Sequence, residues 1–432
     1  MDVDASIPKK SIAPFATVPV GIVSIVGLVS LILVSGQYGW HRDELYFLAA
    51  ADRLDFGYVD QPPLTPLLTK ISAFMFGDTP SGVRILAAFA FVVIIVLAAM
   101  ICRELGGGRL AQSLAAISAA ACGQFLAVGH MVSTSTFDAV FWLALSWFCL
   151  RILRTGETRW WIGAGVVAGI GLQNKYLIGL LALSLLIGVL AVGPRSALRG
   201  RWPLIGIGIA LVIAAPNLIW QFANGWPQLT VAGGISGVDG GENRILFLPS
   251  QLYYLSPLLV PVWLLGWWRL WIDETLRWSR PFAVAYPVAS IIVLLAGGKG
   301  YYVAPLLLVL TAAGSPLVAE WVRRGRVMIR RVSLVAMALV AAASSAVMTL
   351  PLLPPGDLGL INTINPEQGE QVGWYEFAEA VGEAYSAIPA EVRTDTIIIT
   401  ANYGEAGAIE HYGPEFGLPK PYSPHMGYSA WG

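Results

Sequence analysis

The stretch that decides the fold is YGWHRDELYFLAAADRLDFGYVDQPPLTPLL, residues 38–68, which directly follows the apolar run 18–34. This stretch is rich in acidic and basic residues, which a loop that only links two membrane helices does not need. They are His41, Arg42, Asp43, Glu44, Asp52, Arg53, Asp55 and Asp60. Ionisable groups next to a membrane span usually mark a functional site. We therefore interpret residues 38–68 as part of an active site at the membrane surface.

The overall composition is that of a membrane protein. Hydrophobic residues make up 56% of the 432 residues and charged residues only 12%, which is about half the charged share of a soluble domain. A soluble fold cannot hide so much apolar surface. The net charge is zero, so charge alone predicts no nucleic-acid partner. The spacing of Cys102, Cys122 and Cys149 fits neither a metal site nor a redox pair, and we expect free, buried thiols.

Eleven apolar stretches are long enough, or nearly long enough, to cross a bilayer. They lie near residues 18–36, 82–102, 110–129, 136–153, 160–173, 177–193, 203–222, 250–268, 281–297, 301–319 and 332–350. No small-residue cleavage site follows the first stretch, so we expect it to remain as an uncleaved span. The predicted fold is an all-α polytopic membrane protein with about eleven transmembrane helices.

The distribution of lysine and arginine predicts the orientation. With the N-terminus inside, the inner segments hold 18 of the 27 lysines and arginines, from Lys9 and Lys10 to the run RRGRVMIRR at 323–331. Such an excess of basic residues is typical of cytoplasmic loops. An odd number of spans then places the C-terminal segment outside the cytoplasm, in what we expect to be a bacterial plasma membrane.

The composition changes after the last span. Residues 1–352 are predicted to form the transmembrane domain and residues 353–432 a small extracytoplasmic α/β domain, which is richer in Glu, Pro, Gly and Tyr. TDTIIIT (394–400) predicts a buried strand, and ANYGEAGAIEHYG (401–413) a turn and a short helix. The segment stops abruptly after GYSAWG, and we expect it to be a piece of a larger domain.

Charged residues outside the spans gather in the loops of the outer face. They are Asp43, Glu44 and Asp60 in the first outer loop, followed by Asp138, Lys175, Arg244 and Lys299. A solute transporter is expected to place such groups near the bilayer midplane. An enzyme that acts on a lipid-borne substrate needs carboxylates and cations at one interfacial depth, and this is the observed pattern.

Several of these residues also have a purely structural interpretation. Asp43 is placed to take a proton from a hydroxyl, but Asp43 and Glu44 can equally cap the following helix. GYVDQPPLTPLL (57–68) predicts a rigid turn and a new helix, with Tyr58, Asp60 and Gln61 facing a polar head group. Lys299 in GGKGYY can bind a phosphate beside Tyr301 and Tyr302, or only extend towards the interface. His130 is expected to be a packing residue and not a metal ligand.

The same residues resemble a known family. HRDELYFLAAADRLDFGYVDQPPLTPLL (41–68) is similar to the first outer loop of the protein O-mannosyltransferase-like glycosyltransferases, which are glycosyltransferase family 39 and its bacterial relatives of the GT-C fold. The resemblance continues through STFDAVFWLALSWF, GLQNKYLIGLL, PNLIWQFANGWPQL and GGKGYYVAPLLLVL, and covers about residues 35–320.

The resemblance implies a membrane enzyme that moves a sugar from a polyprenyl-phosphate carrier to an acceptor hydroxyl outside the cytoplasm. It implies Asp43 as the general base, Glu44 as an acceptor-binding acid and Asp138 as a second catalytic acid. A relative, the lipid A aminoarabinose transferase, uses a Tyr-x-Glu-Lys-Pro turn for a metal ion and the lipid phosphate. Here Gln61 stands where that lysine does, so Lys299, Arg244 or Lys175 would supply the charge. Whether the site binds a divalent metal ion, with Asp60 as a ligand, stays open.

Two other functions stay open on the sequence alone. One is a transporter of polyprenyl lipids or sugar-lipids, and the other is an inactive homologue that serves as an assembly scaffold. The acceptor of a transferase is also open, since a glycan, a lipid, a protein or a natural product all carry hydroxyl groups.

Overall fold

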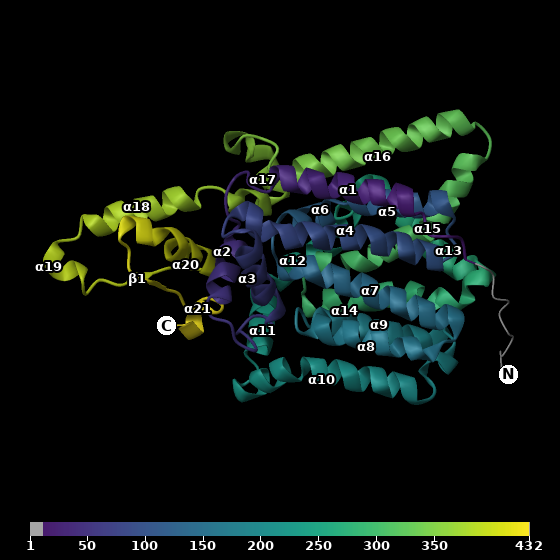
Figure 1. Cartoon of the computed structure of the whole chain (residues 1–432), viewed down its shortest axis with the longest axis horizontal. Helices are drawn as coiled ribbons and strands as arrows, with labels where there is room; N and C mark the ends of the chain where they lie inside the picture. The colour runs from purple at the N-terminus through teal and green to yellow at the C-terminus, as the bar shows by residue number, and fades with distance from the viewer. Residues whose placement is uncertain (1–11, 432) are drawn as a thin grey trace.

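The computed structural model describes residues 12–431, so Lys9 and Lys10 lie outside the described part. Long helices stand side by side in one bundle, with the N-terminal end of the chain at one end (Figure 1). The helices α2 (Arg42–Ala51) and α3 (Leu64–Phe76) and the C-terminal segment lie at the opposite end. The link between α15 (Ala304–Arg323) and α16 (Val327–Thr349), which is rich in arginine, lies at the N-terminal end.

Seven helices in residues 12–431 are long and apolar enough to cross a membrane. They are α1 (Thr17–Val34), α4 (Pro80–Glu104), α7 (Thr134–Thr155), α10 (Arg201–Ala223), α14 (Arg280–Ala296) with η4 (Glu274–Ser279), α15 with η5 (Gly300–Val303), and α16. Two further pairs pass the same test but are bent: α5 (Arg109–Ala120) with α6 (Gly123–His130), by 60°, and α12 (Gly240–Tyr253) with α13 (Val260–Ile272), by 72°.

All eleven predicted stretches coincide with helices, but fewer than eleven meet the length and composition of a membrane span by themselves. In the described part of the chain seven helices, or nine if each bent pair is one span, meet the length and composition of a membrane span. The fifth and sixth stretches form α8 (Trp161–Leu172) and α9 (Leu177–Val192), of 12 and 16 residues. At about 1.5 Å per residue these helices are about 18 and 24 Å long, shorter than the ~30 Å hydrocarbon core.

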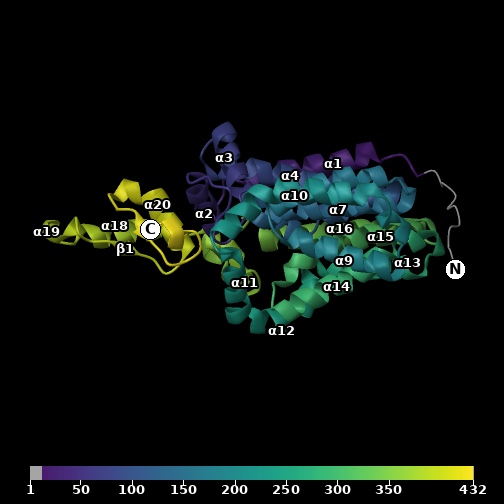
Figure 2. The same ribbon diagram turned by 90° about the horizontal axis from the view of Figure 1, so that it is seen from below.

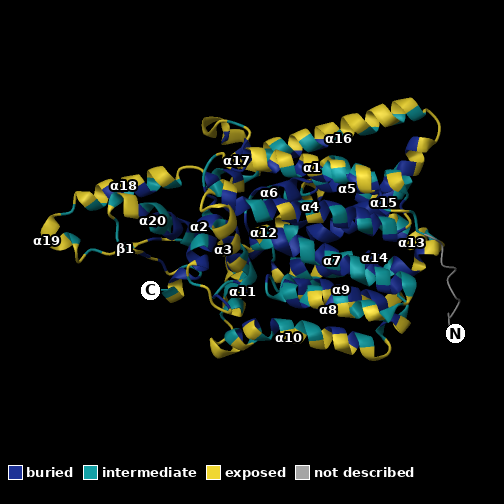
Figure 3. Ribbon diagram, in the orientation of Figure 1, coloured by how far each residue is buried: buried dark blue, intermediate teal, exposed yellow. Residues whose placement is uncertain are grey.

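The centre of the bundle is formed by α15, α7 and α4, and its rim by α1, α10 and α16, whose outer faces are exposed and apolar (Figure 3). Close packing in the centre depends on small residues. A side chain on Gly266 of α13 would lie 1.8 Å from the carbonyl oxygen of Leu310, and one on Gly314 of α15 would lie 2.0 Å from that of Val262. Membrane helices gain contact area by such close approach of their backbones.

The three cysteines are free, as predicted. Cys102 and Cys122 are buried, and Cys149 is partly buried. The predicted helix after the two prolines is α3, which begins directly after Pro63. Beyond it on the same end of the bundle, α11 (Pro227–Val238) connects α10 to α12 (Figure 2).

The C-terminal segment extends beyond the bundle and is mainly helical (Figures 1 and 2). It contains α17 (Gly359–Ile364), η7 (Pro366–Gln371), α18 (Trp374–Ser386), α19 (Ala390–Arg393), α20 (Tyr403–Tyr412), η8 (Gly413–Phe416) and α21 (Tyr428–Trp431). Its only described strands, β1 (Ile398–Ile399) and β2 (Pro421–Tyr422), form a parallel pair. The strand predicted in TDTIIIT is therefore two residues long and is not buried, since Ile399 is exposed. The predicted short helix is α20, capped by the side chain of Asn402.

Candidate active site

The first turn of α2 is held by a reciprocal cap. The ring Nδ1 of His41 accepts a hydrogen bond from the backbone N–H of Asp43 at 3.1 Å, and Oε2 of Glu44 accepts one from the backbone N–H of His41 at 2.9 Å. The cap satisfies two donors that a helix start otherwise leaves free. The capping acid is thus Glu44 and not Asp43, whose carboxylate takes no part in the cap.

The carboxylate of Glu44 is also paired with a buried arginine. Arg84 of α4 donates from Nη2 to Oε2 of Glu44 at 2.6 Å and from Nε to Oε1 at 2.9 Å, and the backbone N–H of Val132 donates to Oε1 at 3.1 Å. Arg84 also donates to the carbonyls of Ser35 and Gly39. A buried ion pair persists only with such full hydrogen bonding. The structure therefore gives Glu44 the role of fastening the first loop, whereas the resemblance implied acceptor binding.

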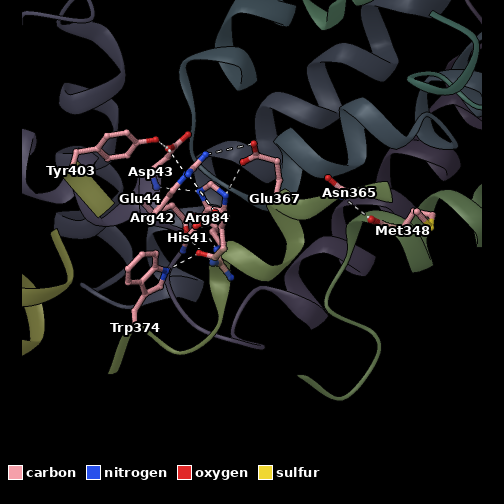
Figure 4. A network of polar contacts seen from close by, with 11 residues as sticks. His41, Arg42, Asp43, Glu44, Arg84, Met348, Asn365, Glu367, Trp374 and Tyr403 are labelled. Carbon is pink, nitrogen blue, oxygen red and sulfur yellow. Dashed lines mark hydrogen bonds and ion pairs between the residues drawn. The ribbon is translucent and has the colours of Figure 1, made fainter. Parts of the chain in front are cut away.

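Asp43 presents its carboxylate to a partly open space. Its side chain is 30% exposed, and Oδ1 accepts a hydrogen bond from the hydroxyl of Tyr403 at 2.6 Å and lies 3.9 Å from Nε of Arg42. No described hydrogen bond engages Oδ2. Figure 4 shows Tyr403 approaching Asp43 from the C-terminal segment on one side and Glu367 approaching Arg42 on the other. A carboxylate with one oxygen fixed and one oxygen free can accept a proton from an approaching hydroxyl.

Lys175 brings a cation to the same region from the loop between α8 and α9. Its ammonium donates to Oγ of Ser135 at 3.2 Å. It lies 4.8 Å from the ring centre of Tyr302 and 5.6 Å from that of Tyr301, which is a cation–π arrangement. Tyr301 and Tyr302 lie edge to face at 5.0 Å. These contacts hold an ammonium group in a largely desolvated place.

The other predicted charged residues affect the pKa of Lys175. Burial lowers the pKa of Lys175, the charges of Asp138 and Asp43 raise it, and the charge of Lys299 lowers it. Asp138 is buried in the first turns of α7, and its Oδ1 has no hydrogen-bond partner in the described part of the chain. Lys299 precedes η5 and is partly buried. Asp43, Asp138, Lys175, Lys299, Tyr301 and Tyr302 thus border one polar region, although they come from four separate segments of the chain.

The turn at residues 57–63 is built differently from the prediction. The hydroxyl of Tyr58 donates to the carbonyl of Ala50 at 2.9 Å, so Tyr58 holds α2 and does not face a head group. Oδ1 of Asp60 accepts a hydrogen bond from Tyr46 at 2.5 Å, and burial raises the pKa of Asp60 to about 6. Gln61 is buried, and its side-chain amide has no partner among the described residues. Gln61 therefore keeps free hydrogen-bonding capacity in its side chain.

Arg244 does not join the polar region by any described contact. It is exposed on α12, and its guanidinium donates to the carbonyl of Leu295 at 3.1 Å beside the glycine turn at 297–298. It therefore supports that turn, and Lys175 and Lys299 remain as the predicted phosphate-binding lysines of the polar region. His130 is buried and contacts Gln371 at 3.2 Å, as a packing histidine would.

The donor set does not fit a resident divalent metal ion. In residues 12–431 no three His, Cys, Asp or Glu side chains gather as metal ligands. The one predicted ligand, Asp60, already accepts a short hydrogen bond from Tyr46. The described side chains thus form no ready-made set of protein ligands for a divalent ion.

Three residues of the site were not predicted from the sequence. Two of them lie far from the first loop in the sequence, and the third resembled an ordinary charged loop residue. Tyr403 and Glu367 come from the C-terminal segment, and Arg42 lies between them and is within ion-pair distance of Glu367 and Glu370. The acidic run NPEQGE at 365–370, which contains a proline, was the one feature of the sequence that could have drawn attention to Glu367. The sequence pattern does not show which loop Glu367 contacts.

Part of the sequence is similar to known proteins. Residues 60–220 match the model of the dolichyl-phosphate-mannose-protein mannosyltransferase family. The Bacillus subtilis protein YkcB is 26% identical over 176 residues, which are 40% of this chain and 24% of that protein. A polyprenol-phosphate-mannose–protein mannosyltransferase of Corynebacterium glutamicum is 28% identical over 144 residues, which are 28% of each chain. The matches thus span about a quarter of the length of these relatives.

The whole fold is found in solved structures. The ArnT structure from Cupriavidus metallidurans, bound to undecaprenyl phosphate, aligns with a TM-score of 0.64 at 14% identity over 94% of this chain and 86% of that one. The Archaeoglobus fulgidus oligosaccharyltransferase aligns with a TM-score of 0.54 at 15% identity over 90% of this chain and 59% of that one. The chain therefore has the GT-C fold that its sequence resemblance implied, with a match to the dolichyl-phosphate-mannose-protein mannosyltransferase family over residues 60–220.

Proposed function

We propose that this chain is an integral membrane glycosyltransferase that moves a sugar from a polyprenyl-phosphate carrier to an acceptor hydroxyl. The observation that carries the proposal is the part-exposed carboxylate of Asp43 in one polar region with Lys175 and Lys299. A base and two cations at one end of a membrane bundle suit a reaction in which a hydroxyl attacks and a lipid phosphate leaves. The similarity to an ArnT structure bound to undecaprenyl phosphate supports this donor class.

Asp43 would act as the general base. Its free Oδ2 takes the proton of the acceptor hydroxyl while the hydroxyl oxygen attacks the anomeric carbon of the sugar. The bond between that carbon and the phosphate oxygen breaks, and the phosphate leaves with the electron pair. Because attack and departure take place on opposite faces of the carbon, the configuration inverts.

The cations would stabilise the departing phosphate. A lipid monophosphate gains negative charge as its bond to the sugar breaks, and fixed positive groups lower the energy of that state. Lys175 is held by Ser135 and two tyrosine rings, while Lys299 has no described hydrogen bond or ion pair and remains available to a ligand. Asp138 would keep Lys175 protonated, since its charge raises the pKa of that lysine.

We further propose that this end of the bundle lies outside the cytoplasm of a bacterial cell. The arginine-rich link between α15 and α16 lies at the opposite end, as basic loops do on the cytoplasmic side (Figure 1). Ser386 is exposed at the end of α18. A cysteine introduced there should react with a membrane-impermeant thiol reagent in intact cells, and labelling only after lysis would reverse the orientation.

The acceptor is proposed only as a hydroxyl-bearing glycan, lipid, protein or natural product. The C-terminal segment borders Asp43 through Tyr403 and therefore forms part of the surface that an acceptor meets. The Corynebacterium relative is a protein mannosyltransferase, which makes a peptide hydroxyl the first acceptor to examine.

The proposal is tested with purified protein in detergent and radiolabelled undecaprenyl-phosphate-mannose. A threonine-containing peptide and octyl mannoside serve as acceptors, and the release of undecaprenyl phosphate is measured together with labelled product. Enzyme-dependent release coupled to product supports a transferase. Movement of the labelled lipid across proteoliposomes without cleavage of the sugar–phosphate bond would support a transporter instead.

A further inference from the structure

The segment that follows α16 folds back onto the first loop and stays there through side-chain hydrogen bonds. Nδ2 of Asn365 donates to the carbonyl of Met348 at 2.8 Å, and Nε2 of Gln368 donates to that of Leu350 at 2.5 Å. From the other side, the hydroxyl of Tyr38 donates to the carbonyl of Leu353 at 2.6 Å. The short helix η7 therefore has a fixed place beside the first turn of α2 (Figure 4).

Glu367 of η7 contacts that first turn at two points. Its Oε2 lies 3.4 Å from Nε2 of His41, and its Oε1 lies 3.7 Å from Nη2 of Arg42. The contact with His41, together with the charges of Arg42 and Lys299, lowers the pKa of Glu367 to about 2, although half of its side chain is exposed. Glu367 is therefore charged at any working pH, and it lies among the cations that surround Asp43.

The cap of α2 fixes which nitrogen of His41 carries the proton. Nδ1 accepts from the backbone N–H of Asp43, so it has a free electron pair and the hydrogen lies on Nε2. His41 is fully buried, and Nε2 has no partner in residues 12–431 that meets hydrogen-bond geometry. Oε2 of Glu367, 3.4 Å from Nε2, is an acceptor towards which this buried N–H can point. Burial lowers the pKa of His41, and the charges of Glu367, Asp43 and Glu44 outweigh that effect and raise it.

Resting on the proposed function, we infer that Glu367 is a positioning residue for Asp43 that acts through His41. The carboxylate of Glu367 orients the ring by attracting Nε2–H, the ring Nδ1 holds the backbone N–H of Asp43, and the first turn of α2 thereby aims the side chain of Asp43. The C-terminal segment thus completes the active site. Without it the base is present but less well oriented.

The neighbouring acid Glu370 provides a matched control. It lies in the same short helix and pairs with the same arginine, with its Oε1 3.3 Å from Nη1 of Arg42, but it has no described contact with His41. A purely electrostatic or purely structural effect of this segment would affect Glu367→Gln and Glu370→Gln alike. An effect that runs through His41 would appear only in Glu367→Gln.

A second variant tests the route itself. Asparagine is a favourable N-cap residue, so His41→Asn is expected to keep the cap of α2 while removing Nε2. If Glu367 acts through His41, Glu367→Gln lowers kcat by about 10- to 100-fold in the wild-type background, as expected for a misaligned base, and causes little further loss in His41→Asn. KM for undecaprenyl-phosphate-mannose should change less than twofold.

The same variants are compared by hydrogen–deuterium exchange of peptides that cover residues 40–48, which requires no turnover. Exchange should rise in Glu367→Gln and stay at the wild-type level in Glu370→Gln. Equal exchange in the two variants, or an equal loss of kcat in the wild-type and His41→Asn backgrounds, overturns the positioning role. Asp43→Asn is assayed in parallel. Full activity of that variant refutes the proposed function, whereas loss in Asp43→Asn with none in Glu367→Gln refutes the positioning role alone.

Discussion

The hydroxyl of Tyr403 donates a hydrogen bond of 2.6 Å to Oδ1 of Asp43, and 360 positions of the sequence separate the two residues. Burial and the charge of Asp43 both raise the pKa of Tyr403, so the phenol stays protonated and remains a donor. The ring of Tyr403 also lies 5.2 Å from that of Tyr46 on α2. The C-terminal segment therefore fixes one oxygen of the proposed base and leaves the other for the acceptor.

Removal of that hydroxyl should impair catalysis more than folding. Hydrogen bonds to charged groups contribute about 1.5–3 kcal/mol, so Tyr403→Phe should lower kcat by roughly 10- to 100-fold. The thermal midpoint in detergent should change by only a few degrees. Tyr422→Phe, at an exposed tyrosine of the same segment, is the control. Wild-type turnover of Tyr403→Phe would mean that Asp43 needs no such support.

The pair of Glu44 and Arg84 should determine stability. Loss of one partner of a buried, hydrogen-bonded ion pair costs about 3–5 kcal/mol, because the other charge is left unpaired. Glu44→Ala should therefore lower the thermal midpoint strongly and reduce the yield of folded protein. A variant of Glu44→Ala with an unchanged midpoint and a raised KM for the acceptor would instead support the acceptor-binding role that the resemblance implied.

Lys299 should matter for the donor. If Lys299 pairs with the lipid phosphate, Lys299→Gln removes a charge-assisted hydrogen bond that contributes about 1.5–3 kcal/mol. This loss corresponds to a roughly tenfold to hundredfold lower kcat/KM for undecaprenyl-phosphate-mannose. The acceptor KM should stay near its wild-type value, and Lys299→Arg should retain part of the activity. Lys70→Gln, at a lysine on α3 that is half exposed, is the control. Unchanged donor dependence in Lys299→Gln would shift the phosphate site to Lys175.

Asp60 predicts a pH dependence of stability. Its pKa is raised by burial from the ordinary value near 3.8 to about 6 in the folded protein. The folded state therefore binds the proton more tightly than the unfolded state, and ionisation of Asp60 destabilises the fold as the pH rises through about 6. Asp60→Asn removes this effect, so it should raise the thermal midpoint relative to wild type at pH 7.5 by more than at pH 4.5. The same difference at both pH values would show that Asp60 does not titrate in this way.

The sequence predicted the parts of the fold that depend on local pattern. Apolar length predicted every long helix, and the two prolines predicted the start of α3. The predicted count of eleven exceeds the seven to nine candidate spans because α8 and α9, with 12 and 16 residues, are shorter than their apolar stretches suggested. The bends between α5 and α6 and between α12 and α13 were missed because an apolar pattern does not show a change in the direction of a helix.

The sequence predicted the acids and cations of the candidate site, but not the residues that hold them in place. Asp43, Asp138, Lys175 and Lys299 stand in separate outer loops, and their common depth suggested that they meet. The structural contacts of Glu44 and Tyr58 could not be predicted because both residue types serve chemistry and structure equally well. Only the contacts with Arg84 and with the carbonyl of Ala50 decide between these roles. Glu367 and Tyr403 depend on how the C-terminal segment docks, which no local pattern contains.

The most direct test of the account compares Asp43→Asn with Asp52→Asn. Asp52 ends the same helix, and its side chain is 82% exposed, so its variant controls for the loss of one acid in this loop. Release of undecaprenyl phosphate from undecaprenyl-phosphate-mannose is measured for both proteins in detergent, at equal amounts of folded protein. The account predicts that Asp43→Asn lowers kcat by roughly 10²–10⁴-fold, as the loss of a general base does, while Asp52→Asn stays within about twofold of wild type. Near-normal release by Asp43→Asn would contradict the account.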